Sequence, residues 1–399
     1  MFGIILSIFI ITMGFIIGEI NGVFNESLRD DSALDIYQHQ DRQARFFPLF
    51  SVVRFKNSEC SGNSGNTFRG TCFTKNECAK YGGISSGSCA NKLGVCCTFR
   101  KECGTTSNVN NTYFVNPGFY SSYEGGERCV ITINKCNSNI CQLRIDFLEL
   151  SLSQPNGSGV CDYDFLLISG GSTSVPRICG DNSKQHVYVE FFENNPITIS
   201  INTNAEYKFG RKWNLRIRQI ACDSPWRAPT GCLQYYNTTS GSVTSFNYGT
   251  TTNPRASILP PLVGTRQLQN LNYGVCIRMA LGYCTIEWSQ SETNSFSISG
   301  DSSVVDYTPG IDYSSSGVDC DHNYVIIPNP SINGSRETTD RYCGNGFSTK
   351  TSKSKPFVLY IVTNTDPRAN GPSTDPNAPS PDLENRGFIL NYRQILCDL

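Results

Sequence analysis

The sequence has only three histidines, no excess of charge of either sign and, after its first 22 residues, no apolar run long enough to cross a membrane. It also lacks a His-Glu-x-x-His zinc motif and a Gly-Asp-Ser-Gly-like nucleophile segment, and Lys plus Arg total 33 against 34 Asp plus Glu. These absences argue against a protease and against a nucleic-acid-binding protein. We therefore expect no catalytic residues, and interpret His39, His186 and His322 as polar surface residues, with His186 in a turn.

Residues 1–22 are dominated by Ile, Phe and Gly. An apolar segment of this length predicts a signal peptide that is removed, so we expect a secreted, extracellular protein with no membrane span in the mature chain. Five Asn-x-Ser/Thr acceptor sites agree with passage through the secretory pathway and are the predicted glycosylation sites. They are Asn25, Asn110, Asn156, Asn237 and Asn333.

Residues 23–55 contain no cysteine and are largely polar and charged, which favours a flexible arm or a propeptide. The segment Arg42-Gln-Ala-Arg45 has the two-arginine spacing that processing proteases use, and it predicts cleavage after Arg45. Surface arms also hold such pairs by chance, so an uncleaved arm is the alternative.

Nineteen cysteines in 399 residues predict an extracellular protein built on disulfides. The first six lie within 38 residues rich in Gly, Ser and Asn, a segment too small to fold by burial alone, so we expect three disulfides to stabilise it. Its gaps, with adjacent cysteines at the end, resemble those of an arthropod clip domain. The resemblance implies a clip-like module over residues 56–99 with the pairs Cys60 with Cys96, Cys72 with Cys89 and Cys78 with Cys97. An unrelated three-disulfide knot is the alternative.

From Cys103 onward the chain alternates apolar and polar residues in short runs, for example at Gln142–Phe147 and Trp213–Ile217. Alternation with period two, broken by Gly, Asn and Pro, predicts antiparallel strands with one buried face. Helical periodicity is nearly absent. The number and spacing of the runs predict an all-β fold of two β-sandwiches behind a small N-terminal disulfide knot.

The two halves of this region repeat one another. Cys161-Asp-Tyr-Asp-Phe-Leu-Leu-Ile168 corresponds to Cys320-Asp-His-Asn-Tyr-Val-Ile-Ile327. Leu215-Arg-Ile-Arg-Gln-Ile-Ala-Cys222 corresponds to Leu390-Asn-Tyr-Arg-Gln-Ile-Leu-Cys397. We therefore expect two copies of one fold.

The first copy resembles a CUB domain in its Cys-x-Tyr-Asp motif at Cys161–Asp164, its later Ile-Cys-Gly segment and its closing Trp-x-Leu strand. The resemblance implies CUB-like, jelly-roll β-sandwiches over residues 103–222 and 232–399, joined by a linker over residues 223–231. Trp226 of this linker is expected to fill the junction between them. The implied disulfides are Cys103 with Cys129, Cys161 with Cys179, Cys232 with Cys276 and Cys320 with Cys343.

The repeat accounts for four further cysteines. Cys141 and Cys222 stand at positions equivalent to Cys284 and Cys397, so we predict the pairs Cys141 with Cys222 and Cys284 with Cys397. Cys136 has no counterpart in the second copy and is predicted to be unpaired, either free or bridging to another chain. A pair between Cys136 and Cys141 is the alternative.

Many CUB domains bind calcium through oxygen ligands and use it to hold a lysine or arginine of a partner. Asp164 is the Asp of the motif, whereas the flanking ligand positions fall on Ser153, near Glu149, and on Asn204. In the second copy Asn323 stands at the position of this Asp, and Asn364 or Asp366 takes the later position. Because so little negative charge remains, we expect no metal site and no cofactor, with Asp164 as the one candidate ligand should calcium bind.

The modules together predict a secreted, non-catalytic binding protein whose CUB-like domains recognise an extracellular protein or glycan. The clip-like module points to a specific role as an adaptor or regulator in a protease cascade. The alternative is a structural component of extracellular matrix, cuticle or seminal material, in which Cys136 links chains. The choice of ligand does not follow from a sandwich scaffold alone.

Overall fold

The computed structural model describes the chain between Arg54 and Cys397, with gaps. The described residues are 54–62, 68–206, 209–250, 264–293, 295–298, 320, 322–364 and 385–397. The predicted signal peptide, most of the predicted arm, Asn25, His39, Arg45 and Asp366 lie outside them. Within these ranges nearly all regular structure is β-strand, which confirms the all-β prediction. No helix in the described part of the chain has the length and apolar character needed to cross a membrane.

The N-terminal six-cysteine module is a small antiparallel sheet with a short helix packed on it. Its elements are β1 (Glu59–Ser61), β2 (Arg69–Phe73), α1 (Lys75–Lys80), β3 (Ile84–Cys89), η1 (Ala90–Lys92) and β4 (Gly94–Lys101). The helix begins at a capping box, in which Thr74 and Glu77 each accept a hydrogen bond from the backbone N–H of the other. Three disulfides cross the module and join Cys60 to Cys96, Cys72 to Cys89 and Cys78 to Cys97.

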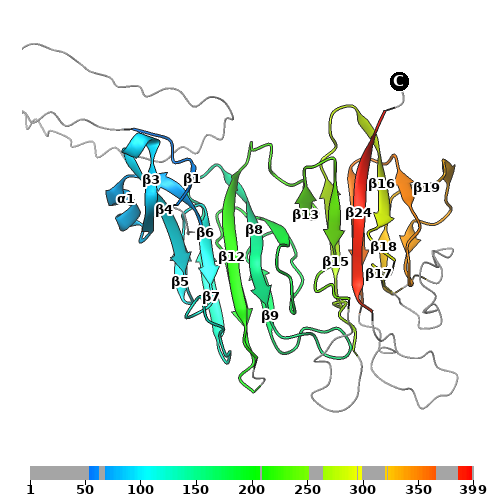
Figure 1. Cartoon of the computed structure of the whole chain (residues 1–399), viewed down its shortest axis with the longest axis horizontal. Helices are drawn as coiled ribbons and strands as arrows, with labels where there is room; N and C mark the ends of the chain where they lie inside the picture. Colours follow the sequence, from blue (N-terminus) through cyan, green and yellow to red (C-terminus); the bar gives the residue numbers. More distant parts are fainter. Residues whose placement is uncertain are drawn as a thin grey trace, which may run out of the picture.

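The first β-sandwich packs two sheets face to face, with strand orders β6-β12-β8-β10 and β5-β7-β11-β9 (Figure 1). Its strands are β5 (Thr105–Ser107), β6 (Thr112–Val115), β7 (Arg128–Ile133), β8 (Ile140–Ser151), β9 (Phe165–Ser169), β10 (His186–Glu190), β11 (Ile197–Asn202) and β12 (Lys212–Ala221). Trp213, Leu215 and Ile217 of β12 are buried in the core between the sheets. The period-two pattern of this segment therefore placed its apolar face correctly.

The sheet of the six-cysteine module continues into the first sandwich. Strand β4 runs parallel to β6 and pairs Phe99 with Thr112, so that β1-β2-β4-β6-β12-β8-β10 is one sheet. The Tyr113 hydroxyl of β6 adds two hydrogen bonds to the backbone of Arg69 in β2, each 2.9 Å long. The module thus covers the edge of the sandwich and is held there by backbone pairing.

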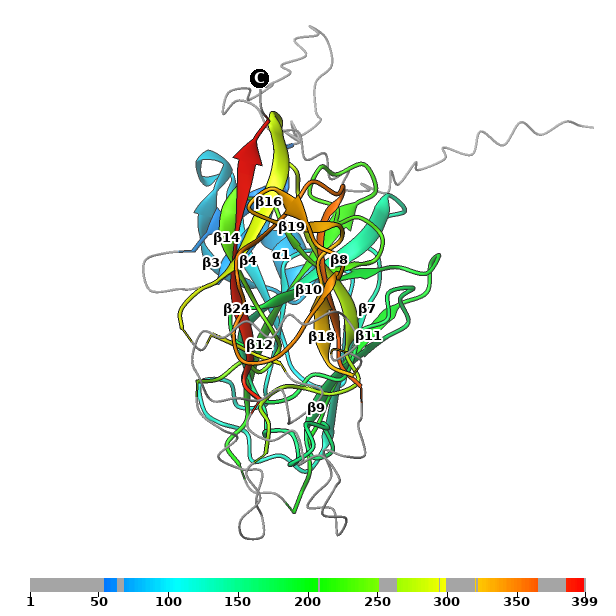
Figure 2. The ribbon, with the colours of Figure 1, turned by 90° about the vertical axis from the view of Figure 1, so that its right-hand side faces the viewer.

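The second β-sandwich, which faces the viewer in Figure 2, repeats the topology of the first. Its sheets have the orders β13-β15-β23-β18-β21 and β14-β24-β16-β22-β19-β20, and β17 pairs with β24. The strands are β13 (Cys232–Tyr236), β14 (Ser240–Thr244), β15 (Asn272–Ile277), β16 (Tyr283–Gln290), β17 (Phe296–Ser297), β18 (Tyr324–Ile326), β19 (Pro330–Ile332), β20 (Ser335–Arg336), β21 (Arg341–Tyr342), β22 (Lys350–Ser352), β23 (Phe357–Val362) and β24 (Gly387–Leu396). In both copies the first strand runs parallel to the third, and the last strand lies between two early ones.

The two sandwiches lie side by side, with β10 of the first against β13 of the second (Figure 1). Ala228 of the linker is buried at this junction, and its backbone N–H and carbonyl both bond to the Gln142 side chain, at 2.9 and 3.1 Å. Trp226 is 38% exposed, so the prediction that it fills the junction is wrong. Ala228 takes that place because Gln142 ties the linker backbone directly to β8.

Candidate functional site

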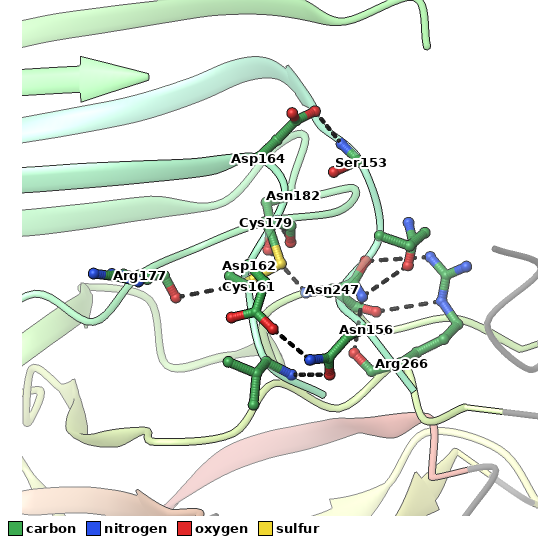
Figure 3. The surroundings of a disulfide bond; sticks show 12 residues. Ser153, Asn156, Cys161, Asp162, Asp164, Arg177, Cys179, Asn182, Asn247 and Arg266 are labelled. Carbon is green, nitrogen blue, oxygen red and sulfur yellow. Dashed lines mark hydrogen bonds between the residues drawn. A yellow bond between two sulfur atoms is a disulfide. The ribbon is translucent and has the colours of Figure 1, made fainter. Parts of the chain in front are cut away.

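Asp164 lies at one end of the first sandwich, where β8 and β11 end and β9 and β12 begin. Its carboxylate is fully buried. Oδ2 accepts a hydrogen bond from the backbone N–H of Ser153 at 2.9 Å, a contact visible in Figure 3, and Oδ1 accepts one from the N–H of Asn204 at 3.0 Å. The side chain therefore joins the loop after β8 to the loop after β11.

Arg211, directly before β12, supplies the counter-charge and is equally buried. Its Nε donates to Oδ2 of Asp164 at 2.8 Å and its Nη2 donates to Oδ1 at 2.9 Å, which makes a bidentate ion pair. The remaining donors go to backbone carbonyls, from Nη2 to Asn204 and from Nη1 to Phe209 and Glu124. All five N–H groups of the guanidinium are thus used.

Gly125 allows the guanidinium to lie against the backbone. Its φ is +91°, and a Cβ at this position would lie 2.5 Å from Nη1 of Arg211. Any other residue would meet both a strained backbone and a steric clash. The glycine and the arginine therefore form one structural unit at this end of the sandwich.

This arrangement does not fit a calcium site. A carboxylate offers about four lone-pair positions, and Ser153, Asn204 and Arg211 together occupy four at Asp164. Glu149 does not join them, since it is 42% exposed and lies 3.8 Å from Nζ of Lys212. In the ranges that the structure describes, no three or more His, Cys, Asp or Glu side chains are grouped to hold a metal. The guanidinium stands where a bound cation would have to be.

The equivalent position of the second sandwich keeps a hydrogen bond and lacks the charge. Asn323 is buried, and its Oδ1 accepts from the backbone N–H of Asn364 at 3.1 Å, as Asp164 accepts from Asn204. The side-chain amide of Asn323 is uncharged, so it offers a metal cation no negative charge. His322, the neighbour of Asn323, lies 3.3 Å from the Asn364 amide nitrogen.

Disulfides join eighteen of the nineteen cysteines. In the sandwiches the joined pairs are Cys103 with Cys129, Cys141 with Cys222, Cys161 with Cys179, Cys232 with Cys276, Cys284 with Cys397 and Cys320 with Cys343. The Cys141 and Cys284 disulfides occupy equivalent places, where the last strand of each copy ends beside the start of an early strand. Cys136 is the one cysteine outside these pairs.

Four of the five glycosylation acceptors lie in the described residues, and they differ in accessibility. Asn237 and Asn333 are exposed. Asn156 is held in a turn by a 2.6 Å hydrogen bond from its Nδ2 to Asp162 (Figure 3), and Oδ1 of Asn110 accepts from the N–H of a residue in β12. Asn237 and Asn333 are therefore the more accessible acceptors for glycan transfer.

A buried polar seam joins the two sandwiches close to the disulfide shown in Figure 3. Asn247 of the second sandwich donates from its N–H to Asn182 at 2.8 Å and from Nδ2 to Gln154 at 2.9 Å, both in the first. Its Oδ1 accepts from the backbone N–H of Asp181 at 3.0 Å. Gly180 has a φ of +79°, and a Cβ there would lie 2.0 Å from this Oδ1. Satisfied polar groups of this kind specify one relative placement of the two sandwiches.

His186 belongs to the same junction, so the prediction of a surface turn was wrong for this residue. It begins β10 and is buried, with Nε2 lying 3.0 Å from the carbonyl and 3.2 Å from the N–H nitrogen of Tyr235. Burial, reinforced by the Arg144 guanidinium, lowers the pKa of His186 to about 4. The imidazole is therefore neutral at physiological pH and contacts the second sandwich instead of solvent.

Among solved structures, the chain is similar to the CUB1-EGF-CUB2 domains of rat MASP-1, at 11% identity and a TM-score of 0.25, covering 72% of this chain and 99% of that chain. It is similar to the CUB1-EGF-CUB2 domain of human MASP-1/3 at 12% identity and a TM-score of 0.23, covering 72% and 100%. The extracellular region of zebrafish Gpr126/Adgrg6 matches at 11% identity and a TM-score of 0.26, covering 74% and 37%. At these TM-scores the similarities carry no further argument.

Curated protein sequences gave no match to this chain. A family model did match, and the matched segment begins near the end of the linker and reaches into the last strand, β24. It therefore spans the second sandwich. Residues 229–395 match the model of the animal CUB domain.

Proposed function

We propose that the chain is a secreted, non-catalytic binding protein that recognises an extracellular protein or glycan through the loops of its sandwiches. The animal CUB domain match over residues 229–395 supports this, because CUB domains mediate protein interactions. The disulfide-rich architecture supports an oxidising, extracellular environment. A signal peptide at residues 1–22 and glycans at Asn237 and Asn333 belong to the same proposal.

The Asp164–Arg211 pair is the observation on which the mode of binding rests. The two side chains hold the loops after β8, after β11 and before β12 through a cation that is part of the chain. These loops keep their shape without calcium, because every polar position of the pair is already satisfied. Recognition therefore proceeds by direct contact with the loops, without a metal ion between the chain and a basic residue of its partner.

We assign the protein the role of adaptor or regulator in a protease cascade, on the support of the clip-like cysteine gaps. The architecture suits this role. Sheet continuity through β4 and β6 fixes the six-cysteine module to the first sandwich, and the Asn247 seam joins the first sandwich to the second. Several surfaces held at constant spacing are what an adaptor needs to bring two partners together.

Capture of partners tests this proposal. We expect the tagged, secreted protein to retain the same discrete partner from native extracellular fluid in calcium and in chelator, as identified by mass spectrometry. A partner released by chelator would contradict direct recognition. Retention of no partner, together with self-association, would contradict the binding function itself.

The alternative is a matrix component that is linked to other chains through Cys136. This role requires the Cys136 thiol to react with a second cysteine. Cys136 is half-buried, its backbone N–H donates to Gln219 at 2.8 Å, and burial raises the pKa of its thiol to about 11. A thiol with a raised pKa holds little thiolate at neutral pH and is a poor nucleophile for disulfide exchange.

We therefore predict that Cys136 of the native protein reacts with a thiol reagent far more slowly than a free cysteine peptide, and at the peptide rate after unfolding without reductant. The measurement is the time course of labelling followed by peptide mapping. Fast labelling in the native state, or a disulfide-linked dimer that disappears on reduction, would favour the matrix role.

A further inference from the structure

The charge of the chain is unevenly distributed, and the six-cysteine module is strongly basic. From Arg54 to Lys101 there are eight Lys or Arg residues and two Asp or Glu residues, a net charge of +6, whereas the whole chain carries −1. A local excess of this size sets the potential around the module, whatever the charge of the rest.

The two acidic residues of the module leave this excess unbalanced. Glu59 pairs with Arg69 and with Arg216 of the first sandwich, at 3.1 and 3.0 Å. Glu77 accepts hydrogen bonds from the N–H and the hydroxyl of Thr74 in the capping box. Within the described residues, the module's cations without an acidic partner in ion-pair distance include Arg54, Lys56, Lys75, Lys80, Lys92 and Lys101.

Two of these lysines lie toward the same end of the module's sheet. The antiparallel pairing of β2 with β4 places Phe73 opposite Val95. Lys75 follows Phe73 by two residues and Lys92 precedes Val95 by three, so both lie at the same end of this sheet. Both are exposed.

The end of α1 brings two more together. Lys80 is exposed and closes the helix, and the chain then turns through Gly82. A Cβ on Gly82 would lie 3.3 Å from Nζ of Lys101, which places this amine at the end of the helix. Lys75 and Lys92 therefore lie toward the start of α1 and Lys80 and Lys101 toward its end. We call these four lysines the basic row.

Helix α1, which carries Lys75 and Lys80, lies on the side of the module that faces away from the second sandwich (Figure 1). The basic row accompanies β4, whose eight residues span roughly 26 Å. Three disulfides fix the elements that carry it. Several unpaired cations spread over a rigid module match a polymer with repeated anionic groups better than a single anion.

We propose that the basic row binds a linear sulfated polysaccharide, on a surface separate from the sandwich loops. Lysines without acidic partners lose no ion pair when they bind sulfates. The three disulfides agree with an extracellular location, where such polymers occur. Binding of single-stranded nucleic acid also calls for aromatic platforms. Beside the row, Tyr81 is 39% exposed and lies against Phe73 with ring centroids 5.7 Å apart, so it offers one partly covered ring and not a series of platforms.

The test uses the full secreted chain and heparin as the probe. The variant K75E/K80E/K92E is expected to bind heparin at least about tenfold more weakly than the wild type at physiological salt, because six units of charge are removed from the row. The variant K184E/K353E/K355E makes the same change in net charge at exposed lysines of the two sandwiches and is expected to bind normally. K75R/K80R/K92R is expected to keep its affinity, and wild-type binding is expected to weaken as salt rises.

Equal loss in both Glu variants would overturn the proposal, since it would reflect net charge alone. Normal binding by K75E/K80E/K92E would overturn it as well. Competition by single-stranded DNA or by phosphatidylserine vesicles, in place of dextran sulfate, would assign the row to another partner. Partner capture by the sandwich loops is measured separately on the same variants. A failure of heparin binding by the basic row is therefore distinguishable from a failure of the proposed function.

Discussion

Replacing Arg211 with alanine is expected to destabilise the first sandwich by about 3 to 5 kcal/mol and to reduce secretion of the protein sharply. The substitution leaves the buried carboxylate of Asp164 without a counter-charge and removes the donors of three backbone carbonyls. A buried, unpaired charge is among the largest penalties a single substitution can create. The measurements are the secreted yield and the urea midpoint of the purified variant.

The control for this experiment is Arg393→Ala in the second sandwich. Arg393 is on β24, the counterpart of β12, and donates to Glu287 at 2.9 Å, but its side chain is 66% exposed. An exposed pair of this kind is worth up to about 1 kcal/mol. Equal effects of the two substitutions would contradict the structural role given to Arg211. A wild-type midpoint that rises on addition of calcium would contradict the misfit between Asp164 and that ion.

Removal of the Cys284–Cys397 disulfide, by Ser at both positions, is expected to lower the stability of the second sandwich by about 4 to 5 kcal/mol in the chain-entropy model. The bond closes a loop with a sequence separation of 113, the longest of the nine, and joins the start of β16 to the end of β24. The expected result is a lower urea midpoint and a low secreted yield. The matched removal of Cys141–Cys222, with a separation of 81, is expected to act similarly on the first sandwich.

Cys136→Ser is the control for both disulfide variants, because it removes a cysteine without opening a loop. We expect its midpoint to lie close to that of the wild type. A disulfide variant that unfolds at the wild-type midpoint would show that strand pairing alone closes the sandwich. Peptide mapping without reduction verifies that the remaining pairs are unchanged in each variant.

Much of the architecture was accessible from local sequence patterns. Period-two alternation identified strands such as β12, whose Trp213 is buried, because each residue's side in a strand follows from its position along it. Cys141 with Cys222 and Cys284 with Cys397 are joined in the structure at the equivalent places that the repeat suggested. Equivalent residues in two copies of one fold have equivalent neighbours in space. A repeat in the sequence therefore predicts which residues are in contact.

The candidate site was only half visible in the sequence. Asp164 was identified from the Cys-x-Tyr-Asp motif, whereas Arg211, 47 residues further on, belongs to no motif that would identify it. One hint was available: a single arginine directly before the alternating run of β12. A sequence pattern does not show that β8 and β11 end where β9 and β12 begin. The partner of the buried Asp164 carboxylate can be identified only once these strand ends are known to lie together.

By itself the sequence determined the all-β class, the disulfide-rich character and the repetition of one sandwich, because these depend on periodicity and on spacing along the chain. Only the tertiary structure decided that His186 is buried against Tyr235, that Ala228 and not Trp226 fills the junction, and that β4 extends the sheet of the first sandwich. Each of these depends on which surfaces pack together. Burial and pairing between distant segments are set by the whole fold, whereas alternation is set by neighbouring residues.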